Sequence, residues 1–141
     1  MALVSSAVTL GLSMAHALEL PAKRRMETAQ WWNLSRTLYR PWFGRAGHAE
    51  GIALLAVPAL AVMDPDSRRQ SLTSSCALLL ANPVLFFSLV AETNRATLRY
   101  GDEVPLDVIA LRDRWEFGHL GRFMCHLVAF LALAWQSSRE S

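Results

Sequence analysis

Four apolar stretches divide the sequence, and their lengths constrain the fold more than any other feature. They cover residues 2–22, 46–63, 71–91 and 117–135. An α-helix needs roughly 20 mainly apolar residues to cross a hydrocarbon core of about 30 Å. Three stretches reach that length easily, whereas the second needs its polar lead-in at residues 46–50. The sequence therefore predicts an all-α fold: a four-helix transmembrane bundle in which residues 1–141 form a single integral membrane domain.

A soluble four-helix bundle is the alternative for a chain of this composition. Hydrophobic residues make up 52% of the chain and charged residues only 18%. The helices of a soluble bundle carry a polar face at regular spacing, and residues 72–91 and 123–135 show almost none. The pattern favours the membrane, with the lipid bilayer as the first expected partner.

The first stretch also has features of a secretory signal peptide. Residues 15–17, Ala-His-Ala, have the small-x-small form of a cleavage site. However, no Lys or Arg precedes the stretch, and the basic run at residues 23–25 follows it as in a stop-transfer segment. We therefore expect an uncleaved first span.

Basic residues are concentrated in two of the three connections between the stretches. The first connection carries six Lys or Arg residues and the third carries four, whereas the second carries only Arg68 and Arg69. Connections rich in Lys and Arg stay on the cytoplasmic side of a membrane. The first and third connections are therefore expected in the cytoplasm, with both termini outside it, in an inner or plasma membrane.

Residues 26–45, in the first connection, have the pattern of an amphipathic helix. Large apolar side chains recur there at helical spacing: Trp31, Leu34, Leu38 and Trp42. Arg36 and Arg40 fall on the opposite face. This pattern predicts an interfacial amphipathic helix between spans 1 and 2, with its aromatic side chains at headgroup depth and its arginines in water.

Polar and ionisable side chains gather at one end of all four predicted spans. They are His16 and Glu19, His48 and Glu50, Glu92 and Asn94, and Glu116 and His119, pair by pair along the chain. The up-down topology places all four pairs at the cytoplasmic face, and charged groups inside a span need a partner or a ligand. A polar pocket at that face is predicted. His48 and Glu50 are two residues apart, so at most one points inward, and Glu50 lies deeper.

Histidine and carboxylate donors from several helices resemble, in type, the ligands of metal sites in helix bundles. The candidate metal ligands are His16, Glu19, Glu50, Glu116 and His119. Such donors suit a transition metal, iron or copper; haem held between histidines would have no attachment motif. A hydrogen-bonded charge network with Arg112 and Arg114, which would only fix helix packing, is the alternative.

A second mechanism needs no metal. A buried histidine can act as a general base near neutral pH, with a carboxylate orienting it. His119 is the candidate base and Glu116 the orienting group. Arg112 would neutralise charge, and Asn94 would donate a hydrogen bond to substrate or oxygen. A hydrophobic substrate from the membrane would suit an apolar cavity, and its deprotonated form can react directly with oxygen.

Four motifs occur in order along the chain: AHALELPAK at residues 15–23, LYR at 38–40, NRAT at 94–97 and LRDRWEFGH at 111–119. Together they resemble the DUF1772 family of small four-span membrane proteins, in which anthrone oxygenase-like proteins are grouped. The resemblance covers nearly the whole chain and reaches His16, Glu19, Asn94, Arg112, Trp115, Glu116 and His119. It does not reach His48 or Glu92. It implies an oxygenase for polycyclic aromatic substrates and prescribes no cofactor.

Two hypotheses of different classes follow. The first is a membrane-embedded oxidoreductase, a monooxygenase-like enzyme acting on a hydrophobic, polycyclic aromatic substrate at the His/Glu site. The second is a non-catalytic small membrane subunit or scaffold, whose polar cluster locks helix packing or binds a partner in a homo-oligomer or membrane complex. A pocket too small for a ligand would favour the second. The sequence has no basic, aromatic-interleaved patch of the kind that binds nucleic acid, so a nucleic-acid partner is not expected.

Overall fold

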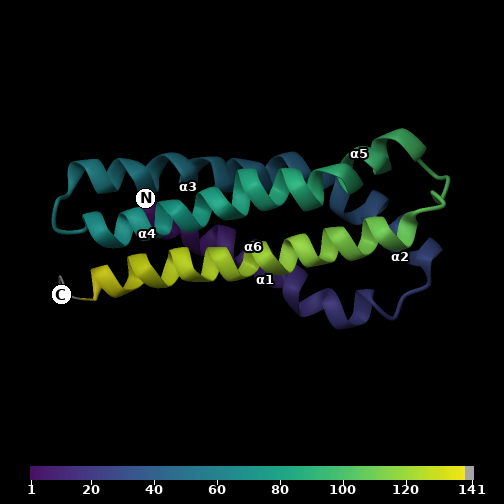
Figure 1. Ribbon diagram of the computed structural model, residues 1–141, viewed down its shortest axis with the longest axis horizontal. Coiled ribbons are helices and arrows are strands. Elements are labelled where there is room, and N and C mark those ends of the chain that lie inside the picture. Colours follow the sequence, from purple (N-terminus) through teal and green to yellow (C-terminus); the bar gives the residue numbers. More distant parts are fainter. Residues whose placement is uncertain (139–141) are drawn as a thin grey trace.

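The computed structural model describes residues 1–138, apart from the side chains of residues 42–44 and 46, and the regular structure in this range is helical (Figure 1). The α-helices are α1 (Ala2–Lys23), α2 (Thr28–Leu34), α3 (Phe43–Met63), α4 (Arg68–Leu79), α5 (Ala91–Tyr100) and α6 (Val108–Ser137). Three other segments are the π-helices η1 (Ser35–Tyr39) and η3 (Leu80–Val90) and the 3₁₀ turn η2 (Arg40–Trp42). The predicted all-α class is confirmed.

Three of the helical segments are long and apolar enough to cross a membrane: α1, the continuous segment Arg68–Tyr100, and α6. Gly47–Met63, the apolar part of α3, is shorter, and at 1.5 Å per residue it extends about 25 Å. The three long helices indicate an integral membrane protein associated with a lipid bilayer. The fourth crossing, by α3, stays a prediction.

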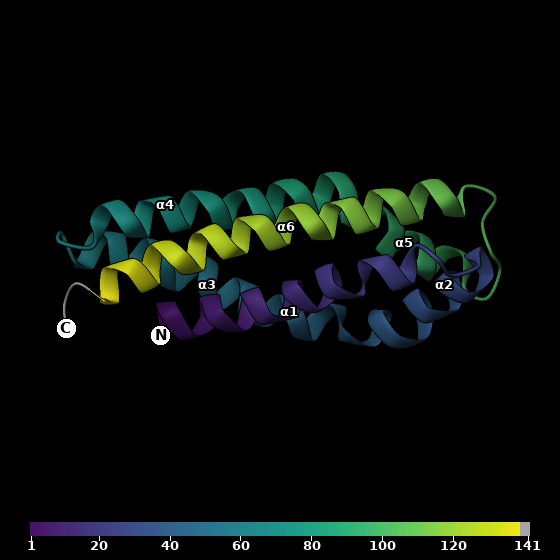
Figure 2. The same ribbon diagram turned by 90° about the horizontal axis from the view of Figure 1, so that it is seen from below.

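The four long segments lie side by side as a bundle (Figure 2). Helix α6 packs against α1, α4 and η3, and α3 packs against α1 and α4. The start of α1 and the end of α6 lie towards one end of the bundle, and α2 and α5 lie at the other (Figure 1). The basic connections are therefore at the end where α2 and α5 sit.

Small and hydroxylated side chains occupy much of the contact between helices. Ser5, Thr9 and Ser13 on α1 are buried, and each donates a hydrogen bond to a carbonyl of its own helix. Ser74 on α4 donates to the Ala129 carbonyl on α6 at 2.7 Å. Such residues let helices approach closely when apolar burial alone does not drive association. The face of α1 that carries these three residues is therefore turned towards the neighbouring helices.

Helix α6 packs very closely against η3 at Gly118. A Cβ atom there would lie 2.8 Å from Val90 Cγ2 and 2.9 Å from Leu89 Cβ, which is tighter than any ordinary contact. The π-helical geometry of η3 accommodates Pro83, which has no backbone N–H to donate. Because His119 follows Gly118 in the chain, this close approach also brings His119 near η3.

The first connection differs from the predicted interfacial helix. Trp31 and Trp32 are 0% and 1% exposed, so the Trp31 side chain is buried within the protein instead of facing lipid headgroups, and its depth in the bilayer stays a prediction. Its indole N–H donates to Glu116 Oε1 at 2.9 Å, and its ring meets Trp115 edge-on. Helical spacing showed an apolar stripe but not that α6 would bury it. The Trp42 side chain lies outside the described residues.

Candidate functional site

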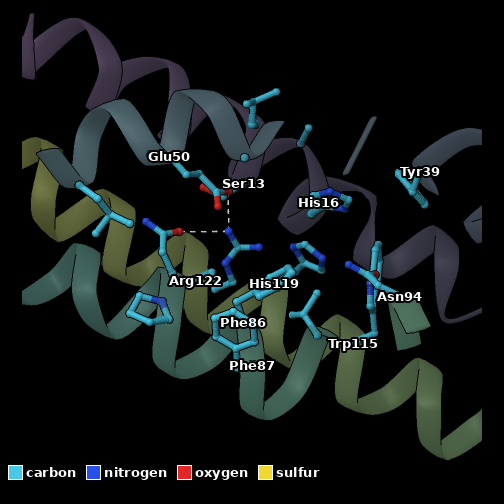
Figure 3. Close-up of a pocket in the computed structure, with 18 of the residues that line it drawn as sticks. Ser13, His16, Tyr39, Glu50, Phe86, Phe87, Asn94, Trp115, His119 and Arg122 are labelled. Atoms are coloured by element: carbon cyan, nitrogen blue, oxygen red, sulfur yellow. Dashed lines mark hydrogen bonds and ion pairs between the residues drawn. The ribbon is translucent and has the colours of Figure 1, made fainter. Parts of the chain in front are cut away.

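A cavity of about 570 Å³ lies between α1, α3, η3 and α6, near the end where α2 sits (Figure 3). Its lining is mainly apolar and includes the aromatic side chains Tyr39, Phe86, Phe87 and Trp115. Its polar lining comprises Ser13, His16, Glu19, Glu50, Asn82, Asn94, His119 and Arg122. The cavity combines an apolar volume with a limited set of polar groups, as small-molecule sites do.

Several predicted site residues meet here from separate helices. His16 and Glu19 come from α1, Glu50 from α3, Asn94 from α5 and His119 from α6, and all five line the cavity. The other predicted members of the polar pairs lie elsewhere. His48 is exposed, and the exposed Glu92 forms an ion pair with Arg114 at 2.9 Å.

His16 and His119 form the centre of the polar wall. Their imidazole rings stack with centroids 4.1 Å apart and planes inclined by 24°. Trp115 meets both rings nearly edge-on, at 5.1 Å from His16 and 4.2 Å from His119. His119 is only 8% exposed, and its interactions within the described chain are these ring contacts, without a hydrogen bond. Its ring nitrogens are therefore available to a molecule in the cavity.

Lys23 lies directly behind His16, and sequence reasoning missed it as a site residue. Its side chain is 1% exposed, and its Nζ lies 3.0 Å from Glu19 Oε2 and 3.1 Å from His16 Nδ1. The ammonium also faces the rings of Tyr39 and Trp115, at 4.6 and 5.0 Å. Lys23 was counted among the basic residues of a connection. Its spacing of four from Glu19 was the available signal that both share a helix face.

Tyr39 packs against the same cluster of His16, Glu19 and Lys23. Its hydroxyl donates to Glu19 Oε2 at 2.5 Å, and its ring lies 5.0 Å from His16. Burial, together with this hydrogen bond to the Glu19 carboxylate, raises the pKa of the Tyr39 phenol. The phenol therefore stays protonated and acts as a donor at physiological pH.

Glu116 is buried beside Lys23 but is not among the described side chains that line the cavity. Its Oε1 accepts the Trp31 hydrogen bond, and its Oε2 lies 3.7 Å from Lys23 Nζ. Its carboxylate therefore contacts Trp31 and Lys23 instead of orienting His119. The three-residue spacing places Glu116 and His119 near one face of α6, yet the two groups face different neighbours.

A buried polar network continues from the cavity into the bundle. Arg122, 4% exposed, forms an ion pair with Glu50 and donates to Asn82 Oδ1 at 3.1 Å (Figure 3). The same oxygen lies 3.2 Å from His126 Nε2, and His126 Nδ1 lies 3.0 Å from Ser13 Oγ. A charged arginine inside an apolar stretch needs a partner. Glu50 is the carboxylate of the second predicted span, so its presence was the sequence signal for an ion pair with Arg122.

Of the predicted catalytic residues Arg112 and Asn94, only Asn94 lies on the cavity. Arg112 donates to the Met26 carbonyl at 3.2 Å and so holds the connection after α1; it is Arg122 that lies on the cavity. Asn94 does line the cavity, and its Oδ1 accepts a hydrogen bond from Trp115 Nε1 at 3.0 Å. Arg122, and not the predicted Arg112, is therefore the arginine that lies on the cavity.

The predicted metal ligands do not fit a metal ion in this arrangement. Within residues 1–138, no group of three or more His, Cys, Asp or Glu side chains is arranged to hold one. Glu19 and Glu116 both face Lys23, and Glu50 faces Arg122. Binding of iron or copper would require these ion pairs to rearrange, and it stays a prediction.

Comparisons of the chain with protein-family models, with curated proteins and with solved structures find no match. The resemblance to the DUF1772 family therefore rests on the four motifs alone.

Proposed function

We propose that the chain is a four-span membrane protein of the anthrone oxygenase-like type, which oxygenates a hydrophobic aromatic substrate in this cavity. The observation that carries the proposal is His119: a buried imidazole without a hydrogen-bond partner in the described chain, on the wall of a largely apolar cavity. A polar cluster that served only to lock helices together would need no cavity. Small-molecule sites typically enclose about 300 to 1,000 Å³, and this cavity falls within that range.

The surroundings of the cavity support access from the bilayer. Leu12, Leu38 and Phe87 belong to its lining and are 42%, 48% and 65% exposed. The basic connections place this end of the bundle at the cytoplasmic face under the positive-inside rule. In this arrangement α3 crosses the membrane as the fourth span, and the segment from α2 to η2 lies at the cytoplasmic interface. A substrate dissolved in lipid would then reach His119 without crossing water.

The reaction begins with general-base catalysis. The His119 imidazole takes a proton from an acidic C–H group, such as a methylene between two aromatic rings. The negative charge that develops is stabilised by the Arg122 guanidinium and by the Asn94 amide. Both side chains line the cavity with His119.

Dioxygen is the second substrate and the oxidant. The carbanion reduces dioxygen and forms a C–O bond, and the imidazolium returns its proton to give a hydroperoxide. Removal of the second C–H proton then expels hydroxide, which takes that proton and leaves as water. In total one methylene and one dioxygen give one carbonyl and one water.

The test is oxygen consumption by the purified protein in lipid nanodiscs with anthrone as substrate. General-base catalysis contributes about 10²- to 10⁴-fold, so we expect His119→Ala to lose at least 100-fold in turnover. His48→Ala is the matched control, since His48 is exposed, and it should retain wild-type turnover. Absence of oxygen uptake by the wild type would contradict the proposal. Binding without turnover would favour the non-catalytic subunit.

A further inference from the structure

We propose that Lys23 sets the tautomer of His16, and that the cavity wall thereby becomes a hydrogen-bond donor site for a ligand that carries a carbonyl or phenolate oxygen. This inference rests on the proposed function, because it names the chemical class of substrate for the same cavity. It also assigns Lys23, which does not itself line the cavity, a positioning role.

The tautomer follows from the chemistry of the Lys23 ammonium. An ammonium group has three donors and no acceptor. The Lys23 Nζ to His16 Nδ1 contact of 3.1 Å therefore requires Nδ1 to accept. The ring proton of a neutral His16 must then sit on Nε2. Because His16 is part of the lining, its imidazole takes part in ligand recognition as an N–H donor.

Lys23 is held firmly enough to impose this choice. Its Nζ lies 3.0 Å from Glu19 Oε2 and 3.7 Å from Glu116 Oε2, and the side chain is 1% exposed. The Tyr39 and Trp115 rings cover it as cation–π partners. The ammonium therefore has fixed partners on several sides, and its contact with His16 is part of that arrangement.

Other polar groups of the lining also have donors to spare. Asn94 Oδ1 accepts from Trp115, which directs the Asn94 amide N–H₂ group elsewhere. Arg122 Nε and Asn82 Nδ2 are buried, and neither has a hydrogen-bond partner within the described chain. Buried donors without an acceptor are rare in native proteins. Both belong to side chains that line the cavity, so this part of the lining has unpaired donors and lacks an acceptor.

The two carboxylates of the lining are already paired with other donors. Glu19 already accepts from Lys23 and Tyr39, and Glu50 is paired with Arg122. The polar wall therefore has unused donors at His16 and Asn94, and an oxygen that only accepts complements them. A carbonyl meets this requirement, and a phenolate adds a negative charge facing Arg122.

The experiment compares two probes that share a methylated bicyclic carbon skeleton, of which only the first carries carbonyl oxygens: 2-methyl-1,4-naphthoquinone and 2-methylnaphthalene. Binding to the full-length protein in nanodiscs is measured by calorimetry, with each affinity corrected for partition of the probe into protein-free nanodiscs. We expect the wild type to prefer the quinone at least tenfold. Lys23→Met should reduce this preference at least threefold, and Arg24→Met, at an exposed neighbouring basic residue, should leave it unchanged.

Nitrogen NMR of the wild type tests the tautomer directly and needs no variant to fold. A proton on His16 Nε2 with an unprotonated Nδ1 is the expected result, and a proton on Nδ1 would overturn the inference. Equal corrected affinity for the two probes would overturn it too, while leaving the proposed aromatic site intact. Failure of both probes to bind would contradict the inference and the proposed function together.

Discussion

The imidazole rings of His16 and His119 stack on one another at 4.1 Å, although one belongs to the first long helix and the other to the last. Stacking leaves the edges of both rings, where the nitrogens lie, free for other interactions. Lys23 takes one nitrogen of His16, whereas the His119 nitrogens have no hydrogen bond in the described chain. Two residues of the same type therefore have different surroundings, and the proposed base is the one without a hydrogen-bond partner.

The ion pair between Arg122 and Glu50 is expected to stabilise the bundle around the cavity. Removing one partner of a buried ion pair leaves an uncompensated charge and costs about 3 to 5 kcal/mol. Arg122 is buried and Glu50 mostly so. We therefore predict that Glu50→Gln lowers the free energy of unfolding by about 3 kcal/mol, measured by denaturant titration in detergent.

Glu92→Gln provides the matched control for this prediction. Glu92 pairs with Arg114, and both side chains are about half exposed. Exposed ion pairs contribute about 0 to 1 kcal/mol, so this variant should unfold close to the wild type. An equal loss in both variants would mean that Glu50 contributes no more than a surface charge.

The close approach of α6 to η3 gives a second stability prediction. A methyl group at Gly118 would collide with Leu89 and Val90, and overpacking of this kind costs about 1 to 3 kcal/mol. We predict that Gly118→Ala lowers the melting temperature in detergent. Gly11→Ala is the control, because the added Cβ meets no atom within 4 Å; a loss as large in this variant would rule out the proposed collision as the cause.

The convergence of His16, Glu50, Asn94 and His119 could be predicted from the sequence because it depends on topology. Span length and the distribution of basic residues establish which helix ends share a membrane face. Side chains at those ends are then brought near one another, and the rotation of each helix decides which of them face inward. The helical repeat explains why His48 is exposed while Glu50 lines the cavity, because residues two apart point to different sides of a helix.

The polar contacts of Lys23 and Arg122 could not be predicted in the same way. Lys23 lies at the end of an apolar stretch, where a lysine in water and a buried lysine look identical in sequence. Its burial depends on Tyr39 and Trp115 folding over it. Similarly, the contact of Arg122 with Asn82 depends on how α6 is rotated against η3, and helix rotation is decided by packing.

The environment of Tyr39 gives a prediction for alkaline pH. Burial and the Glu19 hydrogen bond raise the pKa of the phenol, so the folded protein keeps it protonated where a free tyrosine would ionise, near pH 10. The stabilisation from this protonated phenol is fully present below that pH and is lost progressively as the pH rises from it towards the higher folded-state pKa. Absorbance at 295 nm should therefore rise equally in wild type and Tyr39→Phe up to about pH 11. A larger rise in the wild type would show that Tyr39 ionises normally.

The ion pairs at the candidate metal ligands lead to the last prediction. Glu19 and Glu116 face Lys23, Glu50 faces Arg122, and His16 Nδ1 is taken by Lys23. A metal would have to displace these cations from their carboxylates, so we expect oxygen consumption to be unchanged by 2,2′-bipyridyl, EDTA or bathocuproine. Metal analysis of the purified protein, beside His119→Ala, is the companion measurement. Stoichiometric iron or copper that disappears in the variant, together with chelator-sensitive turnover, would establish a metal site and require the ion pairs around Lys23 and Arg122 to rearrange when it fills.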